Sequence, residues 1–454
     1  MKKKLLAILL VGAMLLSALS FIGCANGGNG ATEPAGDNGA AADDNGAVAD
    51  DNGDAPAVDG DRQTVLVWTW FSEQLGPSVG AAFEEAFPQF YVEAVTIPSG
   101  DLETRLLTGI TAQSGLPDTN SLQGDSIQRF IQFGGLMDLT DIIAPHVDNF
   151  PAYKIANNSD ADGRIFGFPI DAGPSALFFC TVLAEEAGID PAVDFATYES
   201  WLAAGAKYAE IGVALHRMLE TGDAGWTFML TQQQGQSVFD EDGNAMLNTP
   251  EFINAVTLVL DLWNSGFAGE WEEWGPHYPD AVVGGEVGTI IAAAWYMNVF
   301  IHSFSDARDW AIVPMPTFPG STSRTSNAGG SEMVIPIDSD NPEGGIEFAR
   351  FYTANVEGRL IGMEALGEFP AYLPIYDVDE VRTRTLPFFG DQYVFSFFAE
   401  LLPEVPSWRT PSPLIAVRDM VGAEYHLVLS GAMTPAQFAE HVQEMAEAIV
   451  RDFE

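Results

Sequence analysis

Positive charge is what this sequence lacks most. Its 454 residues include 19 Lys and Arg against 64 Asp and Glu, which gives a formal net charge of −45 at pH 7. A body of this charge repels the phosphates of nucleic acids and anionic lipid head groups, so we expect no nucleic acid as a partner. The scarcity of cations equally disfavours an anionic solute as a ligand.

Cysteine and histidine are nearly as scarce. The two cysteines, Cys24 and Cys180, stand in different kinds of segment, so no disulfide framework is expected, and Cys180 lies in an apolar run typical of a buried small side chain. The six histidines show no ligand spacing such as H-E-x-x-H, and no glycine-rich phosphate loop precedes a helix. We therefore predict neither a metal site nor a cofactor.

Residues 1–23 have the pattern of a secretory signal peptide. A charged start, Met1–Lys4, runs into the apolar segment Leu5–Ile22. The segment ends in Gly23-Cys24 and resembles a bacterial lipobox, in which the cysteine becomes the lipidated N-terminus, although Phe21 stands where Leu is usual. An uncleaved transmembrane anchor is the alternative, at the short limit for crossing a bilayer. Both interpretations place the body outside the cytoplasmic membrane, and lipidation at Cys24 would tether it there.

Aromatic residues are absent from residues 25–61, where Gly, Ala, Asn and Asp dominate. Such a segment cannot bury enough apolar surface to fold, and its acidic residues repel one another. We predict a disordered acidic linker over residues 24–62. The Asp-Asp-Asn-Gly repeats are similar to part of a calcium loop, but the full pattern with its distal Glu is missing.

The remaining chain is long enough for two domains with cores of their own. Val65–Trp68 and Phe90–Ala94 have the character of strands, and apolar residues recur at helical spacing over 79–87 and 102–110. This alternation predicts an α/β fold with a mostly parallel sheet covered on both faces. Ligands of such sheets bind at the carboxyl ends of the strands.

The segment Ile165–Phe179 is apolar at both ends and interrupted in the middle by Pro169, Gly173 and Pro174. Prolines and glycine interrupt ladder hydrogen bonding and mark a change of direction. The pattern favours a hinge strand that leaves one lobe and enters a second, with a ligand cleft beside it. An ordinary strand pair with a turn is the alternative.

A set of short motifs recurs in order along the chain: Trp68 and Trp70, Gly115–Asp118, Gly134–Thr140, Gly167–Pro169, Glu185–Asp190, Trp201, Asp240–Gly243, Asn248–Glu251, Gly288–Trp295, Pro314–Pro316 and Gly329–Ser331. In their order and spacing these motifs resemble the family 1 extracellular solute-binding proteins of ABC importers, the maltose-binding-protein-like family. Phe179-Cys180 departs from the Tyr-Asn that the family often has after the crossover.

The resemblance implies a two-lobed periplasmic-binding-protein-like fold of type II, each lobe a mixed sheet flanked by helices. We expect an N-lobe from residues 63–173 and 318–371 and a C-lobe from 174–317 and 372–454. Amphipathic spacing predicts a helix over 343–352 in the first and another over 435–453 in the second.

A sugar cleft needs flat aromatic side chains for the apolar faces of the rings and carboxylates or amides for the hydroxyls. The resemblance assigns ligand contacts to Asp125 and Trp295 individually, whereas the others are chosen by position. Each Trp taken alone is also a common core residue, and Asp171 could cap a helix. The predicted ligand-binding residues are Trp68, Trp70, Asp125, Asp171, Trp226, Trp295, Tyr296 and Trp408.

Enzyme signals are weak. Gly76–Gly80 fits the G-x-S-x-G pattern, but the Ser does not follow a strand directly, and Pro77-Ser78 suits a helix start. A glycosidase with two carboxylates stays open, because acidic residues are abundant.

We therefore predict a monomeric, lipid-anchored binding protein that is not an enzyme and that hands a sugar ligand to an ABC permease. A polyamine or another cationic solute is the second hypothesis, since acids and Trp also bind cations. A carbohydrate-active enzyme is the third.

Overall fold

The computed structural model describes residues 62–219, 221–307, 309–406 and 410–453. The predicted signal peptide, the lipidation site Cys24, the linker up to residue 61 and the site candidate Trp408 lie outside the described residues. Within the described part, no helix is both long and apolar enough to cross a membrane.

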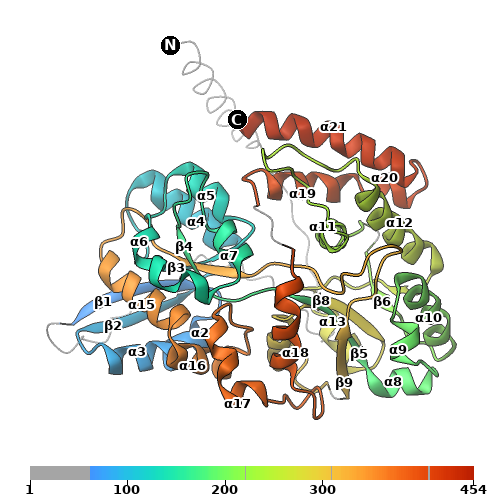
Figure 1. The fold of residues 1–454 in the computed structure, drawn as a ribbon, viewed down its shortest axis with the longest axis horizontal. Helices are drawn as coiled ribbons and strands as arrows, with labels where there is room; N and C mark the ends of the chain where they lie inside the picture. Colours follow the sequence, from blue (N-terminus) through green and yellow to red (C-terminus); the bar gives the residue numbers. More distant parts are fainter. Residues whose placement is uncertain (1–61, 220, 308, 407–409, 454) are drawn as a thin grey trace, which may run out of the picture. The chain divides into compact units, whose positions relative to one another are not determined.

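The larger of the sheets is mixed (Figure 1). Its strands, in spatial order, are β2 (Phe90–Thr96), β1 (Gln63–Thr69), β3 (Thr119–Gln123), β10 (Ser331–Val334) and β4 (Gly167–Pro169). β1 runs parallel to β2 and β3, as predicted, whereas β10 is antiparallel to both of its neighbours. The strand β10 thus returns from much later in the chain and makes the sheet mixed.

Helices cover both faces of this sheet, which confirms the prediction. Side chains of consecutive strand residues point to opposite faces of a sheet, and in β10 Met333 packs in one apolar cluster whereas Val334 packs in another. The Met333 cluster includes side chains of α2 (Ser72–Leu75), α3 (Ala81–Ala86), α6 (Thr140–Ile143), α15 (Pro342–Ala354) and α16 (Val356–Leu366). The Val334 cluster includes side chains of α4 (Ser99–Ala112) and α5 (Ile127–Phe133).

The second sheet is antiparallel throughout, whereas the resemblance implied a mixed sheet in each lobe. It has the order β8 (Thr289–Ala293), β5 (Ser175–Cys180) and β9 (Trp310–Pro314). Every residue of β5 is buried, including Cys180, because both faces are covered, with Phe178 and Phe179 in different clusters. A fully buried run has the same sequence pattern in a parallel and in a covered antiparallel sheet, so the sequence could not distinguish them.

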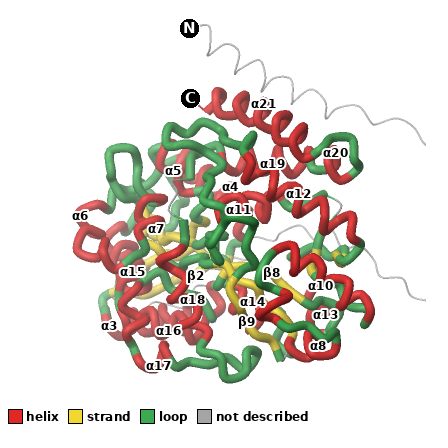
Figure 2. The backbone as a smooth tube through the Cα atoms, turned by 45° about the vertical axis from the view of Figure 1, so that its right-hand side comes forward, coloured by secondary structure: helices red, strands yellow, loops and turns green. Residues whose placement is uncertain are grey.

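Long helices enclose the second sheet, and Figure 2 shows the strands lying inside a shell of helices. The Phe179 cluster includes α10 (Tyr198–Glu210), α11 (Ala224–Gln233), α12 (Pro250–Ser265), α19 (Leu414–Glu424) and α21 (Pro435–Phe453). The Phe178 cluster includes α13 (Tyr278–Val283), α14 (Tyr296–His302) and α18 (Val394–Leu401). The helices α15 and α21 confirm the two amphipathic segments predicted from the sequence.

Short elements complete the described chain. A two-stranded parallel sheet joins β6 (His216–Arg217) and β7 (Ala268–Gly269). The remaining short α-helices are α7 (Ala152–Asn157), α8 (Thr181–Glu186), α9 (Pro191–Asp194), α17 (Asp379–Arg382) and α20 (His426–Leu429), and the 3-10 helices are Ala144–Asn149, Leu373–Asp377 and Leu402–Glu404. A π-helical segment, Gly76–Gly80, separates α2 from α3, so Ser78 lies within a helix and not on a strand-to-helix turn.

The chain passes from one sheet to the other between β4 and β5, as the interrupted apolar segment predicted. Two more segments run beside this crossing. Ala172 N donates to Phe369 O at 3.0 Å, and Ala328 N donates to Gly173 O at 3.0 Å. Gly173 is required by this approach, because a Cβ there would lie 2.4 Å from the carbonyl oxygen of Ala328. Residues 170–174, 327–331 and 369–371 therefore form the connection between the sheets, which we call the crossing segments.

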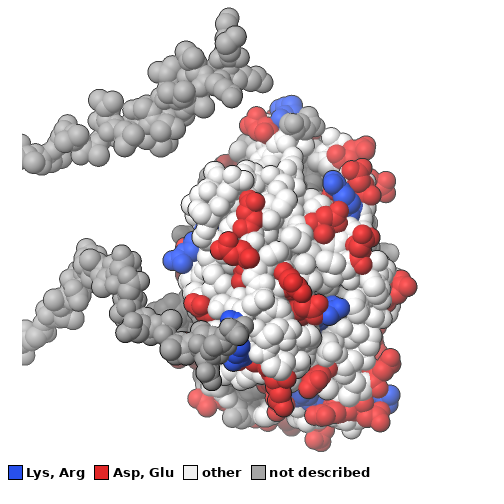
Figure 3. All heavy atoms as spheres, turned by 90° about the vertical axis from the view of Figure 1, so that its left-hand side faces the viewer, with Lys and Arg blue, Asp and Glu red and all other residues white. Residues whose placement is uncertain are grey.

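Acidic side chains are spread over the face of the molecule drawn in Figure 3, with fewer basic side chains between them. This distribution agrees with the strong excess of Asp and Glu in the sequence. The basic side chains on that face are scattered among acidic ones and form no basic patch of the kind that binds nucleic acid.

Candidate binding site

A cavity of about 170 Å³ adjoins the crossing segments. Four parts of the chain form its wall: the loop after β3, helix α11 with the turn that follows it, residues 327–329, and residues 410–418. The wall therefore combines residues attached to the five-stranded sheet with residues attached to the three-stranded sheet.

Helix α11 supplies several apolar residues of the wall. Asp223 caps its N-terminus, where the carboxylate accepts the backbone N–H of Trp226 at 2.8 Å. Phe228 and Gln232, four residues apart, share one face of the helix and line the cavity together with Met229. Trp226 lies on another face, is 8% exposed, packs in the core and does not line the cavity, so its ligand contact stays a prediction.

The cavity wall holds an ion pair. Asp125, in the loop between β3 and α5, accepts a hydrogen bond from Arg418 Nη1 of α19 at 2.8 Å. Both side chains are about one-third exposed, so the pair contributes at most about 1 kcal/mol to stability. Among the described residues that line the cavity, these are the charged ones, so the described wall has no net charge.

An unpaired acceptor also belongs to the wall. The side-chain oxygen Oδ1 of Asn327 is buried and has no hydrogen-bond partner among the described residues, although Asn327 Nδ2 donates to Gly329 O at 3.2 Å. A buried polar atom without a partner is costly. This oxygen lies against the backbone of Gly173, where a Cβ would fall 3.0 Å from it.

Residues 410–424 join the two halves at the cavity. Thr410 N donates to Asn157 Oδ1 at 3.2 Å, a contact with α7, and Ser412 Oγ donates to Gln128 O of α5 at 3.2 Å. Val417 and Val421 of α19, a few residues further on, are buried in the core around the three-stranded sheet. The position of Arg418 opposite Asp125 depends on this connection.

Trp295 stands at the edge of the cavity. It lies between β8 and α14, is half-buried, and donates its Nε1–H to Ala328 O at 2.8 Å. Ala328 itself lines the cavity. The next residue, Tyr296, is 0% exposed, packs in the core and does not line the cavity, so its ligand contact stays a prediction.

Asp171 clamps two crossing segments together. It is 8% exposed, and its Oδ1 accepts the backbone N–H of Ser331 at 2.6 Å. Burial raises the pKa of Asp171 above its usual value, whereas the charge of Lys154 lowers it. Asp171 does not line the cavity, so the structure gives it a part in connecting the sheets.

Trp68 and Trp70 are half-buried at the carboxyl end of β1 and are not part of the cavity wall. Trp70 packs edge-on against Phe71, with ring centroids 5.6 Å apart. A ligand contact for either residue stays a prediction.

Some residues of the wall escaped the sequence analysis. Phe228 has a signal, since it belongs to the helix that Asp223 caps and lies four residues before Gln232. Arg418 has none, because 293 residues separate it from Asp125. Within the glutamine run, Gln233 points elsewhere: it accepts from Tyr198 Oη at 2.8 Å and is 1% exposed.

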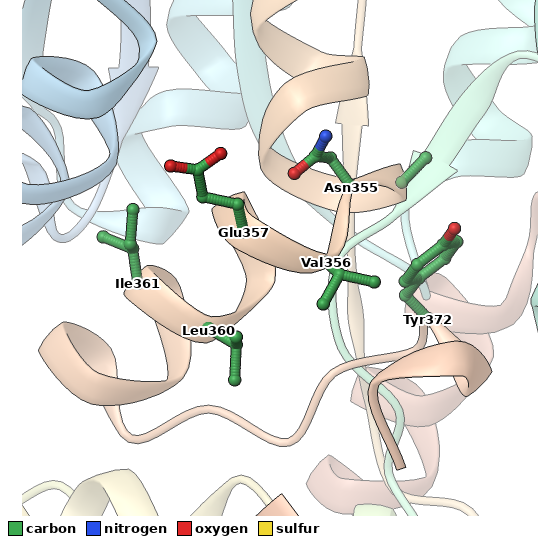
Figure 4. Close-up of a pocket in the computed structure, with 7 residues that line it drawn as sticks. Asn355, Val356, Glu357, Leu360, Ile361 and Tyr372 are labelled. Atoms are coloured by element: carbon green, nitrogen blue, oxygen red, sulfur yellow. The ribbon is translucent and has the colours of Figure 1, made fainter. Parts of the chain in front are cut away.

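A larger hollow of about 720 Å³ lies where α15 and α16 meet, beside Tyr372 (Figure 4). Its lining is mainly apolar, and Asn355, which also lines it, is already used to cap α16 by accepting from Gly358 N at 3.1 Å. None of the predicted site residues lines it, so we place the candidate site at the smaller cavity. Within the described ranges, no three His, Cys, Asp or Glu side chains are grouped in a way that could hold a metal ion.

Comparisons with known proteins give a consistent result. Residues 78–385 match the family described as bacterial extracellular solute-binding protein. The arabinooligosaccharide-binding protein of Halalkalibacterium halodurans is 24% identical over 398 residues, which cover 85% of this chain and 89% of that protein. The lactose-binding protein of Rhizobium radiobacter is 24% identical over 357 residues, 76% of this chain and 83% of that protein.

A solved structure shows the same architecture. The galacto-N-biose-/lacto-N-biose I-binding protein of the ABC transporter from Bifidobacterium longum, in complex with lacto-N-biose, matches with a TM-score of 0.74 at 18% identity. The match covers 87% of this chain and 99% of that one. This likeness confirms the predicted fold, which is the two-lobed type II periplasmic-binding-protein-like α/β fold.

Proposed function

Since the chain belongs to the family of bacterial extracellular solute-binding proteins, we propose that it captures a carbohydrate between two lobes and delivers it to an ABC permease. The family is extracellular, so the body lies outside the cytoplasmic membrane. Proteins similar to this chain bind solutes, and their names specify arabinooligosaccharides and lactose. The ligand proposed here is correspondingly a mono- or oligosaccharide.

The observation that carries this proposal is the composition of the cavity wall. Gln232 offers an amide, Ser237 offers a hydroxyl, and Phe228 offers an apolar surface. These groups suit a ligand that has hydroxyls on its edges and C–H groups on its faces. The pairing of Asp125 with Arg418 leaves the described wall without net charge, which favours a neutral sugar over a polyamine.

The proposed mechanism is capture without chemistry. The five-stranded sheet belongs to the N-lobe and the three-stranded sheet to the C-lobe, and the crossing segments are the hinge. The wall comes from both lobes, so a bound sugar stabilises the closed form through contacts that the open form does not make.

We place the second lobe boundary later than residue 318, near Gly329-Gly330. Ser326 Oγ donates to Met229 O at 2.7 Å, and Thr325 Oγ1 donates to Ser175 O at 2.9 Å, so residues 325–326 are bound to the three-stranded sheet and α11. In this proposal the N-lobe resumes near Gly329, later than the residue 318 expected from the sequence.

The N-terminal segment supports a proposal of its own, from the sequence alone. We infer that residues 1–23 are a signal peptide, that Cys24 carries the lipid anchor, and that residues 24–62 are the linker that separates the anchor from the body. The protein would then work as a monomer held at the outer surface of the cell membrane.

Isothermal titration calorimetry tests the sugar proposal. The panel is arabinotriose, lactose, lacto-N-biose and maltose, with spermidine as the cationic alternative. We expect one neutral sugar to bind with weak salt dependence, and the variant Gln232→Ala to lose about tenfold in affinity. The matched control is Gln234→Ala, whose side chain bonds to Glu251 O at 2.9 Å and does not line the cavity. Binding of spermidine alone, or hydrolysis of a glycoside, would contradict the proposal.

A further inference from the structure

A tryptophan that no sequence argument selected lies exposed next to the candidate site. Trp274 belongs to the loop 270–277 between β7 and α13, and 68% of its surface is accessible. Its ring stacks on that of Trp295, with centroids 6.0 Å apart and an angle of 27° between the planes. Trp is highly buried on average, so an exposed indole that stacks on a second indole is an unusual surface feature.

The loop that carries Trp274 is held in place by a buried cation. The guanidinium of Arg217, in β6, pairs with Glu273 and also with Asp223, the latter at 3.2 Å. Only 12% of the Arg217 side chain is exposed. Asp223 caps α11, whose residues line the cavity, so one guanidinium fixes both the Trp274 loop and a wall of the site.

Local packing gives the loop a definite shape. The ring of Trp271 lies so close to Gly269 that a Cβ there would fall 1.8 Å from it. Gly275 N donates to Glu272 O at 3.0 Å, which closes a turn around Glu273 and Trp274. Trp274 is thus presented by an ordered turn rather than by a chain free to collapse onto the surface.

Trp295 connects this exposed ring to the cavity. Its Nε1–H donates to the carbonyl oxygen of Ala328, which lines the cavity, while its ring stacks on the ring of Trp274. The cavity, at about 170 Å³, is smaller than the roughly 300–1,000 Å³ of pockets that enclose a drug-sized ligand. An oligosaccharide bound there would extend beyond it.

We propose that Trp274 is an outer stacking platform for a sugar unit lying beyond the cavity, and that it makes the site prefer oligosaccharides to monosaccharides. The inference rests on the proposed function and adds a specificity-determining residue to it. The face of the indole not covered by Trp295 takes the C–H face of a sugar ring, and Arg217 acts as a positioning residue through Glu273.

The test compares affinities along a chain-length series. Arabinose, arabinobiose and arabinotriose, with galactose and lactose as a second series, are titrated by calorimetry into the wild type and into Trp274→Ala. We expect the variant to lose about tenfold in affinity for the longest bound sugar, and less than twofold for the monosaccharide. Tyr393→Ala, which removes another aromatic ring that is 51% exposed, is the matched control and should change neither.

A second variant tests the positioning role. Glu273→Gln should weaken oligosaccharide binding in the wild-type background and have little further effect in the Trp274→Ala background. Equal effects in the two backgrounds would show that Glu273 does not act through Trp274. Thermal unfolding should be nearly unchanged in Trp274→Ala, because the side chain is exposed.

The outcomes separate the two proposals. If the wild type binds a sugar and Trp274→Ala binds every chain length as the wild type does, or loses affinity for all lengths equally, the inference about Trp274 is wrong and the proposed function stands. If the wild type binds no sugar of either series or of the wider panel, both are wrong.

Discussion

Replacing Lys154 by methionine should be among the most damaging single changes in this protein. Lys154 of α7 pairs with Glu332 of β10, and their side chains are 2% and 0% exposed. Asn158 Nδ2 also donates to Glu332 Oε2 at 2.8 Å. Methionine keeps most of the apolar length of lysine but removes the ammonium group, so the variant leaves the Glu332 carboxylate buried without a countercharge.

The magnitude follows from the burial of both partners. Removing one partner of a buried ion pair costs about 3–5 kcal/mol. Glu332 can avoid part of this cost by binding a proton, because burial already raises its pKa to about 7 while Lys154 lowers it. Without Lys154 the pKa rises further, and the folded variant takes up a proton that the unfolded chain releases above its usual pKa of 4.5. The variant therefore loses stability as pH rises, by up to about 1.4 kcal/mol per pH unit.

Urea unfolding followed by circular dichroism measures this effect. We expect Lys154→Met to lower the free energy of unfolding by about 3 kcal/mol or more at pH 8.5 and by less at pH 6. The double variant Lys154→Met/Glu332→Gln should recover much of the loss, because the buried charge is gone. The control Lys207→Met removes a pair with Asp194 in which Lys207 is 42% exposed, and should cost less than about 1 kcal/mol. A loss for Lys154→Met as small as that of the control at both pH values would refute the reasoning.

Three further predictions concern the wild type and the site. The free energy of unfolding of the wild type should fall as pH rises from 4.5 to about 7. The raised pKa of Glu332 stabilises the folded state below this pH range, and that stabilisation is lost as the carboxyl group ionises. Urea titrations at pH 5 and 8 check the prediction, and a higher free energy of unfolding at pH 8 would contradict it. Gly173→Ala places a Cβ 2.4 Å from Ala328 O and should destabilise the protein by about 1–3 kcal/mol, measured by thermal unfolding. An unchanged midpoint temperature of unfolding would show that the crossing segments can move apart without cost. Asp125→Asn should change stability by less than about 1 kcal/mol, since its pair with Arg418 is partly exposed, yet lower sugar affinity about tenfold in calorimetry; unchanged affinity would remove Asp125 from the site.

Local patterns predicted the elements well where one physical cause dominates. The stripe of Leu102, Leu106 and Ile110 is the buried face of α4, and α21 spans the predicted 435–453. Periodic burial leaves a direct mark on the sequence, because each buried position must be apolar. The interrupted segment around Gly173 carries a similar mark, since a backbone approach that excludes a Cβ requires glycine.

The candidate site was predictable only in part. Asp125 was selected and lines the cavity, and Trp295 was selected and stands at its edge, but Trp226 and Tyr296 proved to be core residues. A tryptophan in an apolar context has the same local sequence whether it faces a core or a ligand. The face of α11 that turns inward is decided by packing against other helices, which no single segment records.

The sequence alone determined the α/β class, the crossing between two lobes, the family and the scarcity of groups for metal or phosphate chemistry. Only the tertiary structure decided the antiparallel second sheet, the pairing of Asp125 with Arg418 and the stacking of Trp274 on Trp295. The reason is the range of the interactions involved. Burial period, chain direction and glycine requirements act within a few residues, whereas the cavity is assembled from segments up to about 300 residues apart, whose meeting depends on the whole fold.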